Sequence, residues 1–343
     1  MQPDPRPVAT GVTSAYPVLL LASGLNVPDD LLYDATDGTV LVGEHGDGHL
    51  ARVGGPAGLM RLAQVIQEPE GMAQIGSTTY VADQFNARVV ALTAGGTSTV
   101  LQLLPVASGE NLDGISSDLN GTGLVVPDSP HGTVLFVDTS GHITGRVGGF
   151  GRPAGSTPDP SRGGYLIADE SLSAVYEVTP GGSVTRLGSG LSGADDAARD
   201  RNGHVLVILP APGKVYDATV GASLATGLGN PQGLGFDGAQ NVLVTESDTG
   251  RLDLIVTAFA LTLPTTTVQL QPGQGVCYGI LRASGNSEQV KTYESVGAVP
   301  AVDPLSSNAG EVIPQRCGLA VCTVNLTVHG PSGLEFGSFT YRD

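Results

Sequence analysis

Acidic side chains occupy the same place in three consecutive segments of this sequence. Asp29, Glu70 and Asp113 each follow the proline or leucine that opens a predicted strand, and Gln232 follows the proline of a later one. Carboxylates that converge repel one another unless a proton or a cation lies between them. Calcium binds such oxygen ligands and completes its coordination with water. These four residues therefore form a candidate calcium site, and the alternative is that they are exposed turn residues that bind no metal.

The spacing of these residues comes from an internal repeat of about forty residues. Six tripeptides that open the repeats stand 38 to 43 residues apart and begin at residues 28, 69, 112, 153, 193 and 231. A period near forty with several short strands in each unit is typical of a β-propeller blade. Six openings predict six blades, and the residue after each opening should lie at the rim of the central channel.

The repeats predict short strands and no helices. Apolar runs rich in β-branched residues, such as 242–245, alternate with turns that contain Gly, Asn and Asp. No long stretch has helical periodicity. The sequence therefore predicts an all-β fold.

The sixth repeat lacks its outer strand, and the N-terminal segment provides a copy of it. Residues 15–25 resemble the segments that precede the later repeats, so this strand should complete the sixth blade and close the ring. Closure removes an exposed sheet edge. The predicted boundaries are an N-terminal tail at 1–14, a propeller at 15–260, a linker at 261–267 and a small all-β domain, interpreted as a β-sandwich, at 268–343.

The plan of each repeat resembles a known superfamily. Pro-x-Gly, then Asp, then an apolar run that ends in Ala-Asp or Thr-Glu is similar to the NHL-repeat propellers, and the larger group includes gluconolactonase-like (senescence-marker-like) lactonases, strictosidine-synthase-like proteins and virginiamycin B lyase. The resemblance covers about residues 15–259 and implies a six-bladed propeller.

The lactonases of this superfamily hold calcium at the channel through a Glu, two Asn and an Asp. The resemblance implies that Asp113, in Leu-Asp-Gly, corresponds to the Asp and that Asp29 or Glu70 corresponds to the Glu. The two Asn have no counterpart, and Ala154 and Ala194 occupy places where ligands would be expected.

Two further groups of polar residues are interpreted as structural. Five repeats carry an acid at the end of the second strand, where a carboxylate can accept N–H groups of the following turn. His45 and His49 form a dense polar cluster, which we interpret as a solvated loop. The five acids are Glu44, Asp83, Asp128, Asp169 and Glu246.

Charge and cysteine content limit the environment and the partners. The formal net charge of −17 disfavours nucleic acid and anionic membranes, because both require basic surface. All three cysteines lie in the C-terminal part, and Cys277 is predicted to pair with Cys317 or Cys322, unless all three are buried thiols. A disulfide implies an oxidising compartment. The N-terminus has no signal-peptide features, so either the protein is cytosolic or an export signal has been removed. The cysteines favour the second alternative, with a location outside the cell or in its envelope.

Two functions follow from these observations. The first is a non-catalytic binding or assembly module that recognises a protein, a glycan or its own copies. The alternative is a calcium-dependent hydrolase of lactones or esters, acting at the channel mouth with a channel carboxylate as the base.

Overall fold

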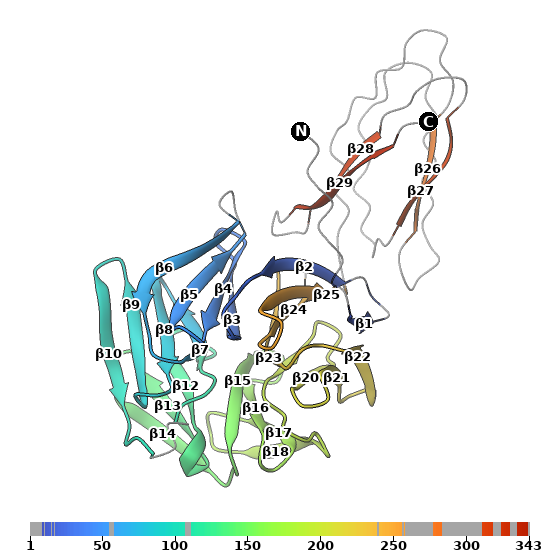
Figure 1. Ribbon diagram of the computed structural model, residues 1–343. Helices are drawn as coiled ribbons and strands as arrows, with labels where there is room; N and C mark the ends of the chain where they lie inside the picture. The colour runs from blue at the N-terminus through green and yellow to red at the C-terminus, as the bar shows by residue number, and fades with distance from the viewer. Residues whose placement is uncertain are drawn as a thin grey trace.

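The structure is a computed structural model that describes residues 9, 11–14, 16, 18–54, 58–106, 111–238, 240–255 and 257, together with strands at 277–282, 311–317, 324–329 and 335–341. Antiparallel sheets surround a central axis, as in a propeller (Figure 1). The only helix in the described part is a 3₁₀ turn at Ser129–His131. None of the described helices has the length and apolar character needed to cross a membrane.

The first three blades each contain four strands, in chain order from the axis outward. Blade one consists of β3 (Pro28–Asp34), β4 (Thr39–Glu44), β5 (His49–Val53) and β6 (Leu59–Val65). Blade two consists of β7 (Pro69–Ile75), β8 (Thr78–Asp83), β9 (Arg88–Thr93) and β10 (Gly96–Gln102). Blade three consists of β11 (Ser116–Ser117), β12 (Gly123–Asp128), β13 (Thr133–Asp138) and β14 (Ile143–Gly148).

Blades four to six complete the ring. Blade four consists of β15 (Pro153–Asp159), β16 (Gly164–Asp169), β17 (Ala174–Val178) and β18 (Val184–Ser189). Blade five consists of β19 (Ala197–Arg199), β20 (Val205–Leu209), β21 (Lys214–Asp217), β22 (Ala222–Thr226) and the short β1 (Thr13–Ser14). Blade six consists of β23 (Pro231–Phe236), β24 (Val242–Glu246), β25 (Arg251–Ile255) and β2 (Val18–Ser23).

The second strand of each blade lies in the core of the ring. Every residue of β4, β12, β16, β20 and β24 is buried, because a neighbouring blade covers each face of the sheet. The side chains of adjacent blades interdigitate, as in the cluster that joins Leu243 and Leu252 of blade six to Val40 and Val42 of blade one. This arrangement explains why these strands are mainly apolar up to the acid that ends most of them, and why their sequence does not alternate.

The N-terminal strand closes the ring, as the sequence predicted. β2 pairs with β25, and the register runs from Val18 opposite Ile255 to Ser23 opposite Arg251. The pairing is irregular between Leu20 and Ala22. The outer strands of the other five blades have an irregularity of the same kind, so β2 occupies the place of a genuine fourth strand.

An interruption at the start of the innermost strands directs side chains toward the axis. In blade one the pairing passes from Pro28 opposite Glu44 directly to Leu31 opposite Val42, and blades two, four and six skip the same two residues. The skipped residues make no ladder pair with the second strand, and their side chains are free to enter the channel. This local geometry positions the candidate site.

The C-terminal part is described as two antiparallel strand pairs. β26 (Cys277–Arg282) pairs with β27 (Glu311–Cys317), and β28 (Val324–His329) pairs with β29 (Glu335–Tyr341). The predicted linker at 261–267 lies outside the described residues, as does much of 268–343. The β-sandwich stays a prediction.

Candidate functional site

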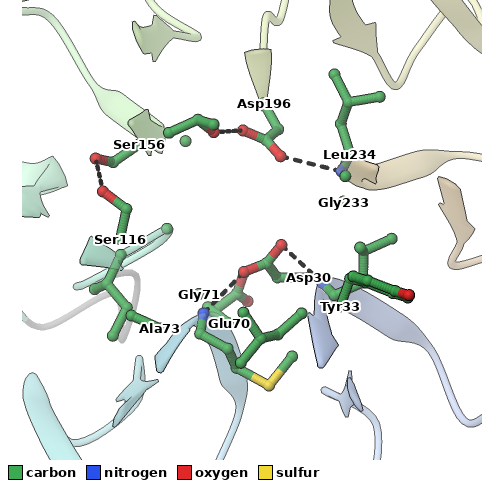
Figure 2. Close-up of a pocket in the computed structure, with 18 of the residues that line it drawn as sticks. Asp30, Tyr33, Glu70, Gly71, Ala73, Ser116, Ser156, Asp196, Gly233 and Leu234 are labelled. Carbon is green, nitrogen blue, oxygen red and sulfur yellow. Dashed lines mark hydrogen bonds between the residues drawn. The ribbon is translucent and has the colours of Figure 1, made fainter. Parts of the chain in front are cut away.

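A cavity of about 500 Å³ follows the propeller axis, and strand starts from all six blades line it (Figure 2). The four residues of the predicted site, Asp29, Glu70, Asp113 and Gln232, all line this cavity. Its volume is in the range of sites that bind small molecules. The repeat therefore brings residues about forty positions apart in sequence to one place.

The rim residue of blade five is an acid, Asp195, and the alanine predicted for this position from the sequence is wrong. The expected rim residue of this blade was Ala194, which is fully buried. Backbone N–H groups of Gly114 and Gly155 donate to the carbonyls of Ala154 and Asp195, the residues at the same place in the next blade. Asp195 is therefore the rim residue. The error is one residue, and it arose because blade five has neither the opening proline nor the glycine after the rim position, so nothing aligns it with the other blades.

The carboxyl groups of Asp29 and Glu70 act on each other at the channel mouth. Burial and the nearby Asp29 raise the pKa of Glu70 well above its usual value. Burial also raises the pKa of Asp29, while its hydrogen bond with Glu70 and the proximity of His45 lower it. Two neighbouring carboxylates repel each other, so this pair favours a shared proton or a bound cation.

His45 lies beside this pair rather than standing free in a solvated loop. Its Nε2 is 3.4 Å from Oε1 of Glu70, and its backbone N–H donates to the carbonyl of Val27. The turn between β4 and β5 therefore brings the imidazole to the channel mouth. His49, the second member of the predicted cluster, instead pairs with Asp47 at 3.0 Å.

Asp113, from the neighbouring blade three, lies in a different electrostatic environment. Arg152 Nη2 is 2.9 Å from Asp113 Oδ2, and the Gln84 side chain donates to Asp113 Oδ1. Burial raises the pKa of Asp113 to about 7, although Arg152 acts against that rise. Arg152 also pairs through Nε with Glu170. Asp113 can therefore exchange a proton near neutral pH.

A second layer of acids lies one residue further along the strands. Asp30 accepts the backbone N–H groups of Leu31 at 2.7 Å and of Met72 in blade two at 2.8 Å. Asp196 does the same with Ala197 and with Leu234 of blade six, as Figure 2 shows for Leu234. These two carboxylates bridge adjacent blades.

Burial dominates the electrostatics of this second layer. It raises the pKa of Asp196 to about 6 and the pKa of Asp30 well above its usual range, and the mutual repulsion of the two carboxylates adds to the rise for Asp30. Blades two, three, four and six carry glycine at this place. Aspartate in place of the repeat glycine was the signal in the sequence that could have identified Asp30 and Asp196.

The sequence analysis also did not predict that residues in the turns after the second strands reach the channel mouth. The residue that follows the strand-end acid reaches the mouth in several blades: His45 approaches Glu70, Gln84 donates to Asp113, and Glu170 pairs with Arg152. A common offset of one residue from the strand-end acid could have identified these residues.

The strand-end acids have structural roles, as predicted. Glu44 accepts the backbone N–H of Asn26 at 2.8 Å and pairs with Arg61, and Asp169 accepts the N–H of Gly151 at 2.7 Å. These bonds hold the turns that present the mouth residues.

The mouth and channel carry a large excess of acidic groups over basic ones. Two cationic or potentially cationic groups, Arg152 and His45, face a set of seven acids: Asp29, Asp30, Glu70, Asp113, Glu170, Asp195 and Asp196. Burial and the surrounding carboxylates raise the pKa of Asp195 well above its usual value. Among the described residues, no three His, Cys, Asp or Glu side chains are arranged to hold a metal ion together.

Comparison with solved structures identifies the same fold in several proteins. A gluconolactonase from Xanthomonas campestris superimposes with a TM-score of 0.58 at 14% identity, over 74% of this chain and 94% of the other. Regucalcin, a calcium-binding protein from Agrobacterium tumefaciens, gives 0.56 at 15% identity over 69% and 92%. Virginiamycin B lyase from Staphylococcus aureus gives 0.52 at 13% over 71% and 98%.

These similarities establish the architecture. The chain is a six-bladed β-propeller of the gluconolactonase, regucalcin and virginiamycin B lyase type in its fold. No family model and no curated protein matches the sequence. Because this fold hosts many activities, function has to be argued from the site.

Proposed function

We propose that the channel mouth binds calcium together with a small neutral ligand, and that the protein hydrolyses a lactone or ester there. The observation that carries this proposal is the convergence of carboxyl groups from blades one, two, three and five on one axial cavity. The excess of acids disfavours anionic substrates, because they would be repelled. A neutral ligand with hydroxyl groups suits the many hydrogen-bond acceptors of the site.

Asp113 is the base of the proposed reaction. A general base works best when its pKa is near the working pH, and the pKa of Asp113 is raised to about 7. The Asp113 carboxylate takes a proton from water as the water oxygen adds to the carbonyl carbon. When the ester C–O bond breaks, Asp113 returns that proton to the leaving oxygen. Arg152, bonded to Asp113, holds the carboxylate in place.

The donor chemistry of the mouth suits calcium, which prefers carboxylate oxygens. The neighbouring carboxyl groups of Asp29 and Glu70 would hold the ion. No three acids of the described residues are spaced to hold one ion together, so water would complete its coordination. When bound, calcium would polarise the substrate carbonyl. His45, next to Glu70, favours the ionised form of these carboxyls when it is protonated.

The test is a hydrolysis assay combined with a binding measurement. Acid release from a panel of lactones and esters is followed at constant pH after removal of divalent cations and again after calcium is restored. We expect turnover that depends on calcium, a loss on the order of 10²-fold or more for Asp113→Asn, and weaker calcium binding in calorimetry for Glu70→Gln.

Asp248→Asn is the matched control, because Asp248 is an exposed acid in a turn at the same face. It should bind calcium and hydrolyse substrate like the wild-type protein. If millimolar calcium produces neither heat nor activity, the calcium-dependent hydrolase is excluded.

The second candidate is a non-catalytic binding or assembly module for a protein, a glycan or a second copy of the chain. Apolar side chains exposed on the mouth face favour it: Val27, Phe85 and Leu172 are 42%, 47% and 42% exposed, in loops that surround the channel. Under this function, Phe85→Ser would weaken partner or self-association, while no lactone or ester would be hydrolysed. We place either activity outside the cytoplasm, on the basis of the predicted disulfide among the three cysteines.

A further inference from the structure

Blade six contains a buried carboxyl group away from the channel. Asp253 lies on β25 and is fully buried, with no accessible surface. Its strand neighbours Leu252 and Leu254 pack against blade one. In the ladder Asp253 lies opposite Val244 of β24 on one side and Leu20 of β2 on the other. The carboxyl group is therefore part of the seam where the N-terminal strand closes the ring.

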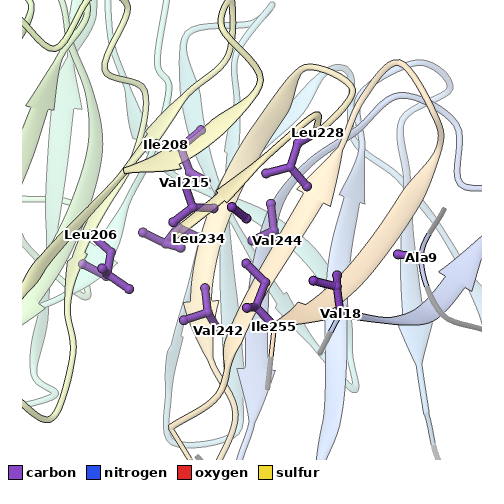
Figure 3. Packing of buried hydrophobic residues seen from close by; sticks show 12 residues of the cluster. Ala9, Val18, Leu206, Ile208, Val215, Leu228, Leu234, Val242, Val244 and Ile255 are labelled. Atoms are coloured by element: carbon purple, nitrogen blue, oxygen red, sulfur yellow. The ribbon is translucent and has the colours of Figure 1, made fainter. Parts of the chain in front are cut away.

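The surroundings of this carboxyl group are apolar. Residues of blades five and six form a cluster in this region that includes Val18, Val244, Ile255, Ile208 and Val215, as Figure 3 shows. β2, with the sequence VLLLAS, contributes no charged group. The charged residues that act on Asp253 are Glu246 and Arg251, both from blade six.

A single guanidinium is shared unequally between the two acids. Glu246 is also fully buried, and Arg251 contacts its Oε1 through Nε at 2.9 Å and Nη2 at 2.5 Å. Glu246 further accepts the backbone N–H of Gly229. Arg251 Nη2 is 3.8 Å from Asp253 Oδ2. In the described part of the chain, no N–H or hydroxyl group donates to either Asp253 oxygen.

This geometry decides which acid holds a proton. Two carboxylates and one guanidinium would leave an uncompensated negative charge in an apolar environment, which is strongly unfavourable. Glu246 has donors that stabilise its ionised form, whereas no donor to Asp253 is present among the described residues. We propose that the Asp253 carboxyl group is protonated in the folded ring and donates a hydrogen bond to the Glu246 carboxylate. Loss of this proton at alkaline pH then weakens the seam closed by β2.

The direction of the effect follows from the two states of Asp253. Burial and Glu246 raise its pKa to about 8, while Arg251 opposes the rise. In the unfolded chain the group ionises near its ordinary value of 3.8. Between these values folding takes up a proton, so stability falls as the pH rises from about 4 to about 8 and then levels off. The N-terminal strand is thus held most weakly in alkaline solution.

The test compares the wild-type chain with Asp253→Asn, whose amide retains a donor for Glu246 but cannot ionise. Denaturant unfolding is measured from pH 5 to pH 9, and hydrogen exchange of β2 and β25 amides is followed over the same range. The ratio of wild-type to variant folding constants should fall up to tenfold per pH unit below about 8. The exchange of β2 amides should accelerate with pH more steeply in the wild type, beyond the chemical rate.

Two further measurements keep the proposal testable if the variant folds poorly. Infrared difference spectra between pH 6 and pH 9 should show a buried protonated carboxyl that disappears at the higher pH, with a smaller band in Asp253→Asn, because the channel acids contribute equally in both proteins. Asp248→Asn, an exposed acid of the same blade, should leave both the pH profile and this band unchanged. Identical pH dependence in wild type and Asp253→Asn, an infrared band of equal size in both, or no protonated carboxyl at pH 6, would overturn the proposal.

Discussion

At the scale of single residues, the position after the rim residue allows close packing in some blades and carries an acid in others. The residue after the rim position is glycine in four blades, where the backbones of neighbouring blades almost touch, and aspartate in blades one and five. A Cβ on Gly71 would lie 2.0 Å from the backbone nitrogen of Ile115. Asp30 and Asp196 instead bond to the next backbone along the ring. The channel therefore combines close packing with buried charge.

We expect Gly71→Ala to destabilise the ring severely, because the added methyl group meets rigid backbone. Overpacking of this kind costs about 1–3 kcal/mol or more. Gly181→Ala is the matched control, because its Cβ would meet only a Thr179 side chain at 3.8 Å. At a compatible site this exchange should change stability by less than about 1 kcal/mol, in the stabilising direction. Denaturant unfolding of both variants checks the difference, and equal stability would contradict the close approach.

The proton on Asp113 should govern the pH dependence of the proposed reaction. The pKa of Asp113 is raised to about 7, so the base form, and with it the hydrolysis rate, should rise with pH through that value. Arg152→Met removes the cation that lowers this pKa and should shift the midpoint upward by about one unit. Rate profiles between pH 5 and pH 9 measure both effects. A midpoint that does not move in the variant would exclude Asp113 as the titrating base.

At the scale of elements, the N-terminal segment fastens two blades. β2 completes blade six, and β1 extends blade five through pairs of Thr13 with Thr226 and Ser14 with Ala225. Ala9 is buried in the cluster between these blades, and its N–H donates to the carbonyl of Val18. The segment thus crosses the seam and contacts both of its sides.

Deletions of two lengths separate the contributions of β1 and β2 to the stability of the ring. Deletion of residues 1–14 removes β1 and Ala9 and should lower the thermal midpoint moderately, because blade six keeps its outer strand. Deletion of residues 1–25 exposes the edge of β25 and should cause aggregation or loss of the folded ring. Light scattering and thermal unfolding distinguish these outcomes. A soluble protein of unchanged stability after the longer deletion would refute closure by β2.

The strand register in the C-terminal part bears on the predicted disulfide. Cys277 and Cys317 are directly opposite in the β26–β27 pair, whereas Cys322 lies outside the described residues. We expect a Cys277–Cys317 bridge, so thiol titration of denatured, non-reduced protein should find one free thiol. Cys322→Ser should then leave none. Three reactive thiols in the unreduced wild type would remove the bridge and the argument for an oxidising compartment.

At the scale of the whole molecule, closure of the ring links calcium binding at the channel mouth to the free energy of unfolding. The mouth acids come from separate blades, so an ion held among them binds the closed ring and not the unfolded chain. Calcium should therefore raise the free energy of unfolding with the logarithm of its excess, by about 2.7 kcal/mol at a hundredfold excess over Kd. Thermal unfolding at increasing calcium concentration checks this slope. Asp29→Asn should flatten it, while Asp248→Asn should not.

The number of blades, the closing strand and three of the four rim acids could be predicted from the order of residues alone. These features follow from local patterns: the forty-residue period, the β-branched second strands and the N-terminal copy of an outer strand. Each pattern appears when one segment of the chain is compared with another, so the residue order alone is enough to identify it.

The remaining acidic and basic groups of the channel mouth, and the buried acid of blade six, could be located only in the folded structure. Asp195 required the register between neighbouring blades, and Asp196 required its bond to Leu234, 38 residues away. His45 and Arg152 reach the mouth from turns, and Asp253 is enclosed where the two ends of the ring meet. The physical reason is that partners, burial and charge balance at these positions come from other blades, which one repeat cannot specify.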